Sequence, residues 1–296
     1  MKSELSGIWP AVASPCDADG VFLEDNYAEL IASLYRTEIK GLYVCGSTGD
    51  GKKMRLQERQ RAAEIAVELS RKSGGKVILH VGAENTRDAV ELTTHGAEAG
   101  VAAVSSLVPA GCSHSQAVAY YTTIARASQL PVVIYHLPLF SHAATFDEIL
   151  EMLDIDGVVG MKFADWDLFF MQRAIRARPE MVVFNGFDEI VCLGLLYGAH
   201  GGIGTWYNLL PGVFVQIHKA VQRGDIDRAM DLQTRLNSFL ELGWQFGLQG
   251  LLEHLMRNRV GGAGLFRAPH IPYDRDLMEK VEPEAAARMA AIEEAM

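Results

Sequence analysis

The 296-residue sequence has few cysteines and no long apolar run. Its four cysteines lie far apart and form no CxxC pair, which favours a reduced protein over a disulfide-linked one. No apolar run reaches the roughly 18 residues of a membrane-spanning helix. The first residues, MKSELSGIWP, lack the hydrophobic core of a signal peptide. These absences predict a cytoplasmic protein with no membrane partner.

Positive charge and metal-ligand spacing are also lacking. Lys and Arg number 27 against 37 Asp and Glu, so the formal net charge is -10. Such a chain lacks the basic surface of a nucleic-acid-binding protein. The nine histidines form no HExxH motif, and no His/Cys group has zinc spacing. We therefore expect no nucleic-acid partner and no metal.

What the sequence has instead is a regular alternation of short apolar runs and amphipathic segments. The apolar runs are nearly continuous, as in parallel strands that are covered on both faces. Helix-period segments such as 25–39, 56–72 and 115–129 lie between them. The apolar runs begin at residues 7, 41, 76, 102, 131, 157, 181 and 201. Eight such units predict an α/β fold, a (β/α)8 TIM barrel, with a doubly wound open sheet as the structural alternative.

The last part of the chain is helix-patterned and contains no candidate strand. We expect a catalytic barrel over 1–224 and a C-terminal helical extension over 225–296 that packs on it. Glycines at 261–264, with Pro269 and Pro272, predict a turn within the extension. Within the barrel, Thr86 is a candidate N-cap and Gly100 a candidate helix end.

Lys162 is the sharpest candidate for chemistry, because it lies in the apolar run GVVGMKFA. Barrel enzymes place their active sites at the carboxyl ends of the strands. Burial favours the neutral form of an amine, which is the nucleophile that attacks a ketone. A structural lysine that pairs with a barrel carboxylate, or reaches solvent, is an equally good interpretation of this pattern alone.

The other strand ends carry polar residues that each have a functional and a structural interpretation. The turn at 46–49, GSTG, offers backbone N–H groups and the hydroxyls of Ser47 and Thr48 to a carboxylate, but it also suits an ordinary turn. Tyr135 could relay a proton or simply be a half-buried strand residue. Asp188 and Glu189 could bind a polyol or favourably begin a helix.

The segment GSTGDGKK at 46–53 also resembles a phosphate-binding P-loop. Lys53, however, stands where that motif needs a Ser or Thr to hold Mg²⁺. The alternating pattern around it also predicts a barrel. We therefore give nucleotide binding little weight.

Five segments in order resemble the dihydrodipicolinate synthase / N-acetylneuraminate lyase family of class I, Schiff-base aldolases. They are GLYVCGSTGDG with LQER, VVIYHLP, VVGMKFADWDL, FNGFDE and GAHGGIGTWYN, and the last two are most similar to the N-acetylneuraminate lyase branch. The resemblance implies that Lys162 forms the Schiff base, Tyr135 relays protons, and Ser47 and Thr48 hold the keto-acid carboxylate. It implies a homotetramer, and a sugar-tail pocket lined by Gly186, Asp188, Glu189 and Thr205.

Several positions depart from the family pattern. Asp50 replaces a glutamate, and Lys52 and Lys53 add charge nearby. Phe140 stands where dihydrodipicolinate synthases have a carboxylate-binding arginine, which argues against that branch. Ala164 replaces a small hydroxyl residue of the lyase branch, and 110–112 reads AGC where many members have a tyrosine that points to a neighbouring subunit.

The resemblance implies reversible cleavage of a 2-keto-3-deoxy sugar acid to pyruvate and an aldehyde. The protonated imine acts as the electron sink, so no metal or organic cofactor is expected. Three alternatives stay open: dehydration of a deoxy-sugar acid through the same imine, dihydrodipicolinate synthase-like condensation, and a non-catalytic ligand-binding relative. Product analysis separates the first from cleavage, and ligand-dependent partner binding without turnover would favour the last.

Overall fold

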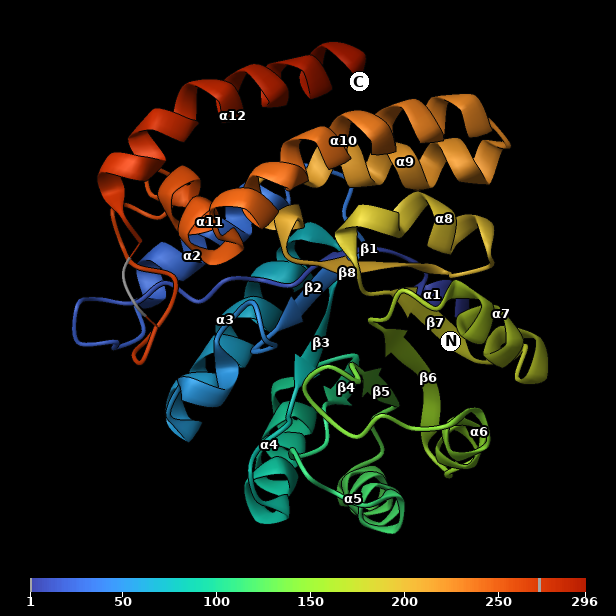
Figure 1. Ribbon diagram of the computed structural model, residues 1–296. Coiled ribbons are helices and arrows are strands. Elements are labelled where there is room, and N and C mark those ends of the chain that lie inside the picture. Colours follow the sequence, from blue (N-terminus) through green and yellow to red (C-terminus); the bar gives the residue numbers. More distant parts are fainter. Residues whose placement is uncertain (1, 271–272) are drawn as a thin grey trace.

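Eight parallel strands form a nearly closed barrel in the computed structural model, which describes residues 2–270 and 273–296 (Figure 1). Around the sheet the hydrogen-bonded order is β1-β8-β7-β6-β5-β4-β3-β2. The strands are β1 Gly7–Pro10, β2 Gly41–Val44, β3 Lys76–His80, β4 Ala103–Ser106, β5 Val132–His136, β6 Val158–Phe163, β7 Val182–Asn185 and β8 Gly201–Gly204. Each lies within a predicted apolar run.

Contacts between β1 and β2 bring the two ends of the sheet together. A parallel bridge joins Ala11 to Tyr43, and Val12 N–H donates to Tyr43 O at 2.9 Å. At the other end of these strands Lys40 N–H donates to Ile8 O at 2.8 Å. The prediction of a TIM barrel is therefore confirmed, and the alternative of a doubly wound open sheet is wrong.

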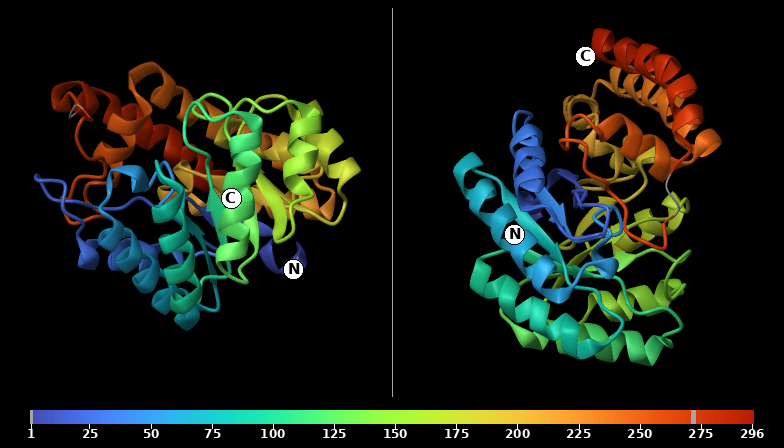
Figure 2. Two further views of the ribbon diagram at one scale, coloured as in Figure 1. Left: turned by 90° about the horizontal axis from the view of Figure 1, so that it is seen from below. Right: turned by 90° about the vertical axis from the view of Figure 1, so that its left-hand side faces the viewer.

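One short helix precedes β1, and the other helices of the barrel follow the strands and form an outer ring (Figures 1 and 2). They are α1 Lys2–Leu5, α2 Glu24–Leu34, α3 Leu56–Ser73, α4 Thr86–Ala99, α5 His114–Ala127, α6 Phe146–Leu153, α7 Leu168–Ala177, α8 Val191–Leu196 and α9 Pro211–Arg223. Short 3₁₀ turns lie at the carboxyl ends of three strands, η1 Gly51–Lys53, η2 Asp188–Ile190 and η3 Trp206–Asn208. No helix of the described ranges is long and apolar enough to cross a membrane.

Two predicted helix ends need correction. The helix predicted to reach residue 39 ends at Leu34, whose carbonyl accepts from both the N–H and the hydroxyl of Thr37, at 3.1 and 2.7 Å, in a turn tighter than that of an α-helix. The N-cap of α4 is Asn85 rather than Thr86, since the Asn85 side chain accepts from Asp88 N–H at 2.9 Å. Gly100 does end this helix, in the left-handed conformation.

Three further helices, α10 Ile226–Phe246, α11 Leu248–Met256 and α12 Arg275–Ala295, follow the barrel. Helix α10 packs against both α9 and α12, which lie side by side with it in Figures 1 and 2. The predicted turn is present at Gly261 and Gly262, both with positive φ. Pro272, the last residue of that prediction, lies outside the described residues.

Candidate active site

Lys162 lies near the carboxyl end of β6 and is 5% exposed. Its Nζ is 4.2 Å from the ring centroid of Tyr135 and 4.9 Å from that of Tyr43. None of the ion pairs formed within 2–270 and 273–296 includes this lysine. The interpretation of Lys162 as a carboxylate-paired structural lysine therefore has no support, and its amine faces two aromatic rings instead.

Tyr135 is next to Lys162 because it is the register partner of that residue in the β5–β6 pairing. Its ring meets the Tyr43 ring edge to face, with centroids 6.3 Å apart. Tyr43 Oη donates to Ser105 Oγ at 3.1 Å, whereas no hydrogen bond within the described ranges holds Tyr135 Oη. Burial raises the pKa of Tyr43 well above its ordinary value, so this residue is a neutral wall. Tyr135 is the tyrosine with a free hydroxyl beside the amine.

His80 also borders the group around Lys162. The sequence alone predicts a site role neither for His80 nor for Tyr43. The His80 ring is 6.1 Å from the Tyr135 ring, and Leu107 N–H donates to His80 Nε2 at 3.1 Å. Burial, followed by the positive charges of Arg59 and Lys162, holds the pKa of His80 well below its ordinary value. The imidazole is therefore neutral. Both residues belong to apolar runs that are typical of a buried core. They differ from ordinary core residues only because their side chains point to the inside of the barrel.

The turn after β2 carries Ser47 and Thr48. Thr48 is buried, and its hydroxyl lies 2.7 Å from the hydroxyl of Thr205, which joins the ends of β2 and β8. Ser47 is exposed. Gly51 is required here, because a Cβ at this position would lie 1.9 Å from Cys45 O. The structure thus brings Thr48 and Thr205 together and leaves the Ser47 hydroxyl accessible.

Asp50, one of the departures from the family pattern, connects this turn to the C-terminal segment. Its carboxylate accepts from Arg267 N–H at 2.7 Å and pairs with Lys53 Nζ at 3.0 Å. Lys52 pairs with Glu84 at 2.9 Å. Both lysines are engaged by protein groups, and the turn follows a barrel strand, so the P-loop interpretation is wrong.

The loop after β7 carries Gly186, Asp188 and Glu189. Asp188 is 5% exposed, and its Oδ2 accepts from Trp206 N–H at 2.7 Å. Burial raises the pKa of Asp188 to about 7; the charge of Glu189 adds to this effect, while the Trp206 N–H and Lys162 oppose it. Glu189 Oε1 accepts from Trp244 Nε1 at 2.9 Å. One acidic group is thus buried and the other is held at the rim.

An apolar wall faces the same space. Tyr135 packs with Leu107, Leu137 and Ala164 in one buried cluster, against which Phe187 also packs. Gly186 lies directly behind Ala164, since a Cβ on this glycine would be 2.7 Å from the Ala164 Cβ. At position 164, where the lyase branch has a small hydroxyl residue, this protein therefore places a methyl group next to Tyr135.

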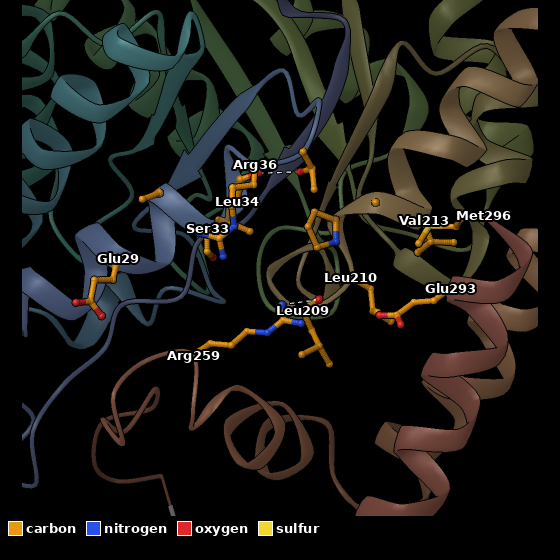
Figure 3. Close-up of a pocket in the computed structure, with 14 residues that line it drawn as sticks. Glu29, Ser33, Leu34, Arg36, Leu209, Leu210, Val213, Arg259, Glu293 and Met296 are labelled. Atoms are coloured by element: carbon orange, nitrogen blue, oxygen red, sulfur yellow. Dashed lines mark hydrogen bonds between the residues drawn. The ribbon is translucent and has the colours of Figure 1, made fainter.

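Two cavities of the protein differ in size and in position relative to the barrel. One, of about 370 Å³, lies at the site and is lined by residues that include Ser47, His80, Leu107 and Phe140. A larger one, of about 680 Å³, lies outside the barrel between α2, the start of α9 and the end of α12 (Figure 3). None of the residues that line this larger cavity belongs to the group around Lys162. The smaller cavity lies at the carboxyl ends of the strands and is lined by His80 of this group, although neither Lys162 nor Tyr135 lines it. Its position, rather than its size, makes it the candidate active-site cavity.

Comparison with known proteins agrees with this geometry. The family model of the dihydrodipicolinate synthetase family matches residues 4–287. N-acetylneuraminate lyases from Citrobacter koseri and Escherichia coli K12 are each 34% identical, over 97% of this chain and 97% of the relative. The chain therefore belongs to the dihydrodipicolinate synthetase family.

Solved structures of similar proteins point to one branch of that family. The protein CdNal from Clostridium difficile, in complex with mannosamine, has a TM-score of 0.90 at 25% identity and covers 96% of this chain and 99% of its own. N-acetylneuraminate lyase from Fusobacterium nucleatum, complexed with pyruvate, has a TM-score of 0.88 at 27% identity and covers 95% and 96%. The protein is an N-acetylneuraminate lyase-like, class I pyruvate-dependent aldolase.

Proposed function

We propose that this aldolase reversibly cleaves a 2-keto-3-deoxy sugar acid of the N-acetylneuraminate type to pyruvate and an aldehyde. The observation that carries the proposal is the buried amine of Lys162, which faces two tyrosine rings and has no carboxylate partner in the described part of the chain. Such an amine is suited to attack a ketone. The likeness to N-acetylneuraminate lyases supports this substrate class.

In the proposed reaction Lys162 attacks C2 of the substrate, and loss of water gives a protonated imine. The C4 hydroxyl then loses its proton to Tyr135, helped by the substrate carboxylate, and becomes the carbonyl of the leaving aldehyde. The electron pair of the C3–C4 bond moves toward the imine nitrogen and forms an enamine. Protonation at C3 and hydrolysis of the imine release pyruvate and regenerate the amine.

The binding roles follow the positions of the remaining polar groups. We assign the substrate carboxylate to Ser47 and Thr48, whose turn faces the same cavity. The hydroxylated tail is assigned to Gly186, Asp188, Glu189 and Thr205. A carboxyl group with a pKa of about 7, such as Asp188, can donate or accept a hydrogen bond near neutral pH.

The same proposal includes the assembly and the cellular setting. We propose a homotetramer, as the family resemblance implies, working in the cytoplasm on a small 2-keto acid. Sedimentation of the purified chain tests the assembly. A chain that sediments as a monomer at micromolar concentration would remove this part of the proposal alone.

The mechanism is tested by trapping the imine. Borohydride added with saturating pyruvate should leave a reduced pyruvate adduct on Lys162, which peptide mass spectrometry locates. Lys162→Ala should abolish the adduct, whereas Lys72→Ala, at an exposed lysine paired with Glu68, should not affect it. Folded wild-type protein without the adduct would refute the role of Lys162. Trapping without release of pyruvate from any sugar acid would instead refute the substrate class.

A further inference from the structure

Two histidines and a glutamate from two separate parts of the sequence, residue 114 and residues 142–148, meet at the outer rim of the barrel. His114 begins α5, His142 lies between β5 and α6, and Glu148 is in the first turn of α6. One ligand atom from each lies within 4.8 Å of the other two. The closest approaches are 3.5 Å between His142 Nε2 and Glu148 Oε2, and 3.9 Å between His114 Nδ1 and Glu148 Oε1.

The two ring nitrogens that face this glutamate are buried and have no hydrogen-bond partner among residues 2–270 and 273–296. They are His114 Nδ1 and His142 Nε2. Two unpaired ring nitrogens that face one carboxylate are available as ligands for a cation. The two imidazole planes are inclined by 29°, with centroids 5.9 Å apart. Because the lone pair of a ring nitrogen lies in the ring plane, a cation would bind at the ring edges that face Glu148.

Glu151 prepares His114 for such a role. Its Oε2 lies 2.7 Å from His114 Nε2, on the side of the ring that faces away from Glu148. A carboxylate at one ring nitrogen holds the proton there and leaves the lone pair of the other nitrogen free for a metal. Together, Glu148 and Glu151 also supply two negative charges against a divalent ion.

Contrary to the expectation of no metal from the sequence, we propose that His114 Nδ1, His142 Nε2 and the Glu148 carboxylate bind one zinc ion, with Glu151 as the orienting partner of His114. Two imidazoles and a carboxylate suit zinc, with bonds of about 2.1 Å to each ligand. Ligand atoms around a tetrahedral zinc ion are then about 3.4 Å apart. The two histidine–glutamate separations, 3.5 and 3.9 Å, are near this value, and the two ring nitrogens lie within 4.8 Å of each other, so side-chain rotations would close the site.

The zinc site would restrict the movement of the 137–144 segment, which lines the candidate active-site cavity through Phe140. His142 follows Phe140 by two residues, and Phe140 is 64% exposed while lining the cavity beside Ser47. Zinc would fix the 137–144 segment to α5 and so fix Phe140 over the cavity. The metal has no place in the imine chemistry, because the site belongs to the outer rim rather than to the group around Lys162.

Zinc titration of the full-length protein, freed of metal with a chelator, tests the proposal. Calorimetry should give one zinc per chain, and Co²⁺ in its place should give the absorption of a tetrahedral site. His114→Ala and His142→Ala should each abolish this binding. Glu148→Gln should also abolish it, although glutamine can still accept the helix-capping hydrogen bond from Thr145 N–H. Glu151→Gln should weaken it by roughly 10–100-fold.

His95→Ala is the matched control, because His95 also pairs with one glutamate, Glu64, and has an unpartnered ring nitrogen, but it belongs to no such cluster in the described ranges. This variant should bind zinc as the wild type does. Wild-type protein that takes up no zinc at micromolar concentration would overturn the proposal. Equal affinity in His142→Ala would also overturn it. Because His142 lies between secondary-structure elements, this variant should stay folded, so that loss of zinc binding reports loss of the ligand.

Discussion

Replacing Asp188 by asparagine should remove a specific pH dependence of stability. The pKa of Asp188 is raised to about 7 in the folded protein, mainly by burial, against an ordinary value of 3.8. Between these two values the folded chain keeps a proton that the unfolded chain has lost. The free energy of unfolding therefore falls as pH rises from about 4 to about 7 and receives no further contribution from this group above that range.

The size of the effect follows from the difference in pKa. About three units at 1.36 kcal/mol each give an upper bound of about 4 kcal/mol for the stability lost across this window. Asparagine carries no charge at any of these pH values and can still accept from Trp206 N–H. In the variant, the free energy of unfolding should therefore lack the fall between about pH 4 and about pH 7 that Asp188 causes. The amide group can still shift this free energy by an amount that does not depend on pH.

Urea unfolding at a fixed protein concentration, repeated between pH 4 and 8, measures the slope. Glu189→Gln provides a second test, because the charge of Glu189 is the next cause of the raised pKa of Asp188. That variant should keep the fall in stability but end it at a lower pH. Equal slopes in wild type and Asp188→Asn would refute the assignment of the buried proton to Asp188.

Two further predictions concern the reaction. Tyr135→Phe should lower the rate of cleavage by roughly 10²–10⁴-fold, the usual contribution of a proton-transferring group, while borohydride trapping of pyruvate persists, though more slowly. Wild-type cleavage kinetics in this variant would remove the tyrosine from the mechanism. The wild-type protein should also fail to condense pyruvate efficiently with aspartate semialdehyde, because Phe140 cannot give a carboxylate the paired hydrogen bonds of an arginine. Rapid condensation in a coupled assay would contradict this.

The barrel itself could be predicted because its strands carry a strong pattern. Strands covered on both faces need apolar side chains on both, so each appears as a short continuous run. Lys162 was conspicuous for the same reason, as a charged residue inside such a run. Residues at strand ends, such as Asp188, followed from the rule that barrel sites lie at the carboxyl ends.

What the sequence did not indicate depends on the direction of side chains and on long-range contacts. Tyr43 and His80 look like ordinary core residues, and only the barrel shows that both face the space around Lys162. The contact between Asp50 and Arg267 N–H joins segments at opposite ends of the chain. The end of α2 differs from the predicted one because the Leu34 carbonyl accepts from the N–H and the hydroxyl of Thr37 rather than continuing the α-helical pattern.

The C-terminal helices take part in holding the candidate tail pocket, which explains why the barrel alone is an incomplete description of this site. Gln233 of α10 donates to Asp188 O at 3.1 Å and accepts from Cys192 N–H at 2.8 Å. Asn237, one turn later, donates to Glu189 O at 2.9 Å. In the proposed mechanism, barrel strands supply the amine and the proton relay, while α10 fixes the backbone that carries both acidic groups. Since the proposed chemistry needs only the first set, we expect substitutions in α10 to change which aldehyde is accepted without changing the imine step.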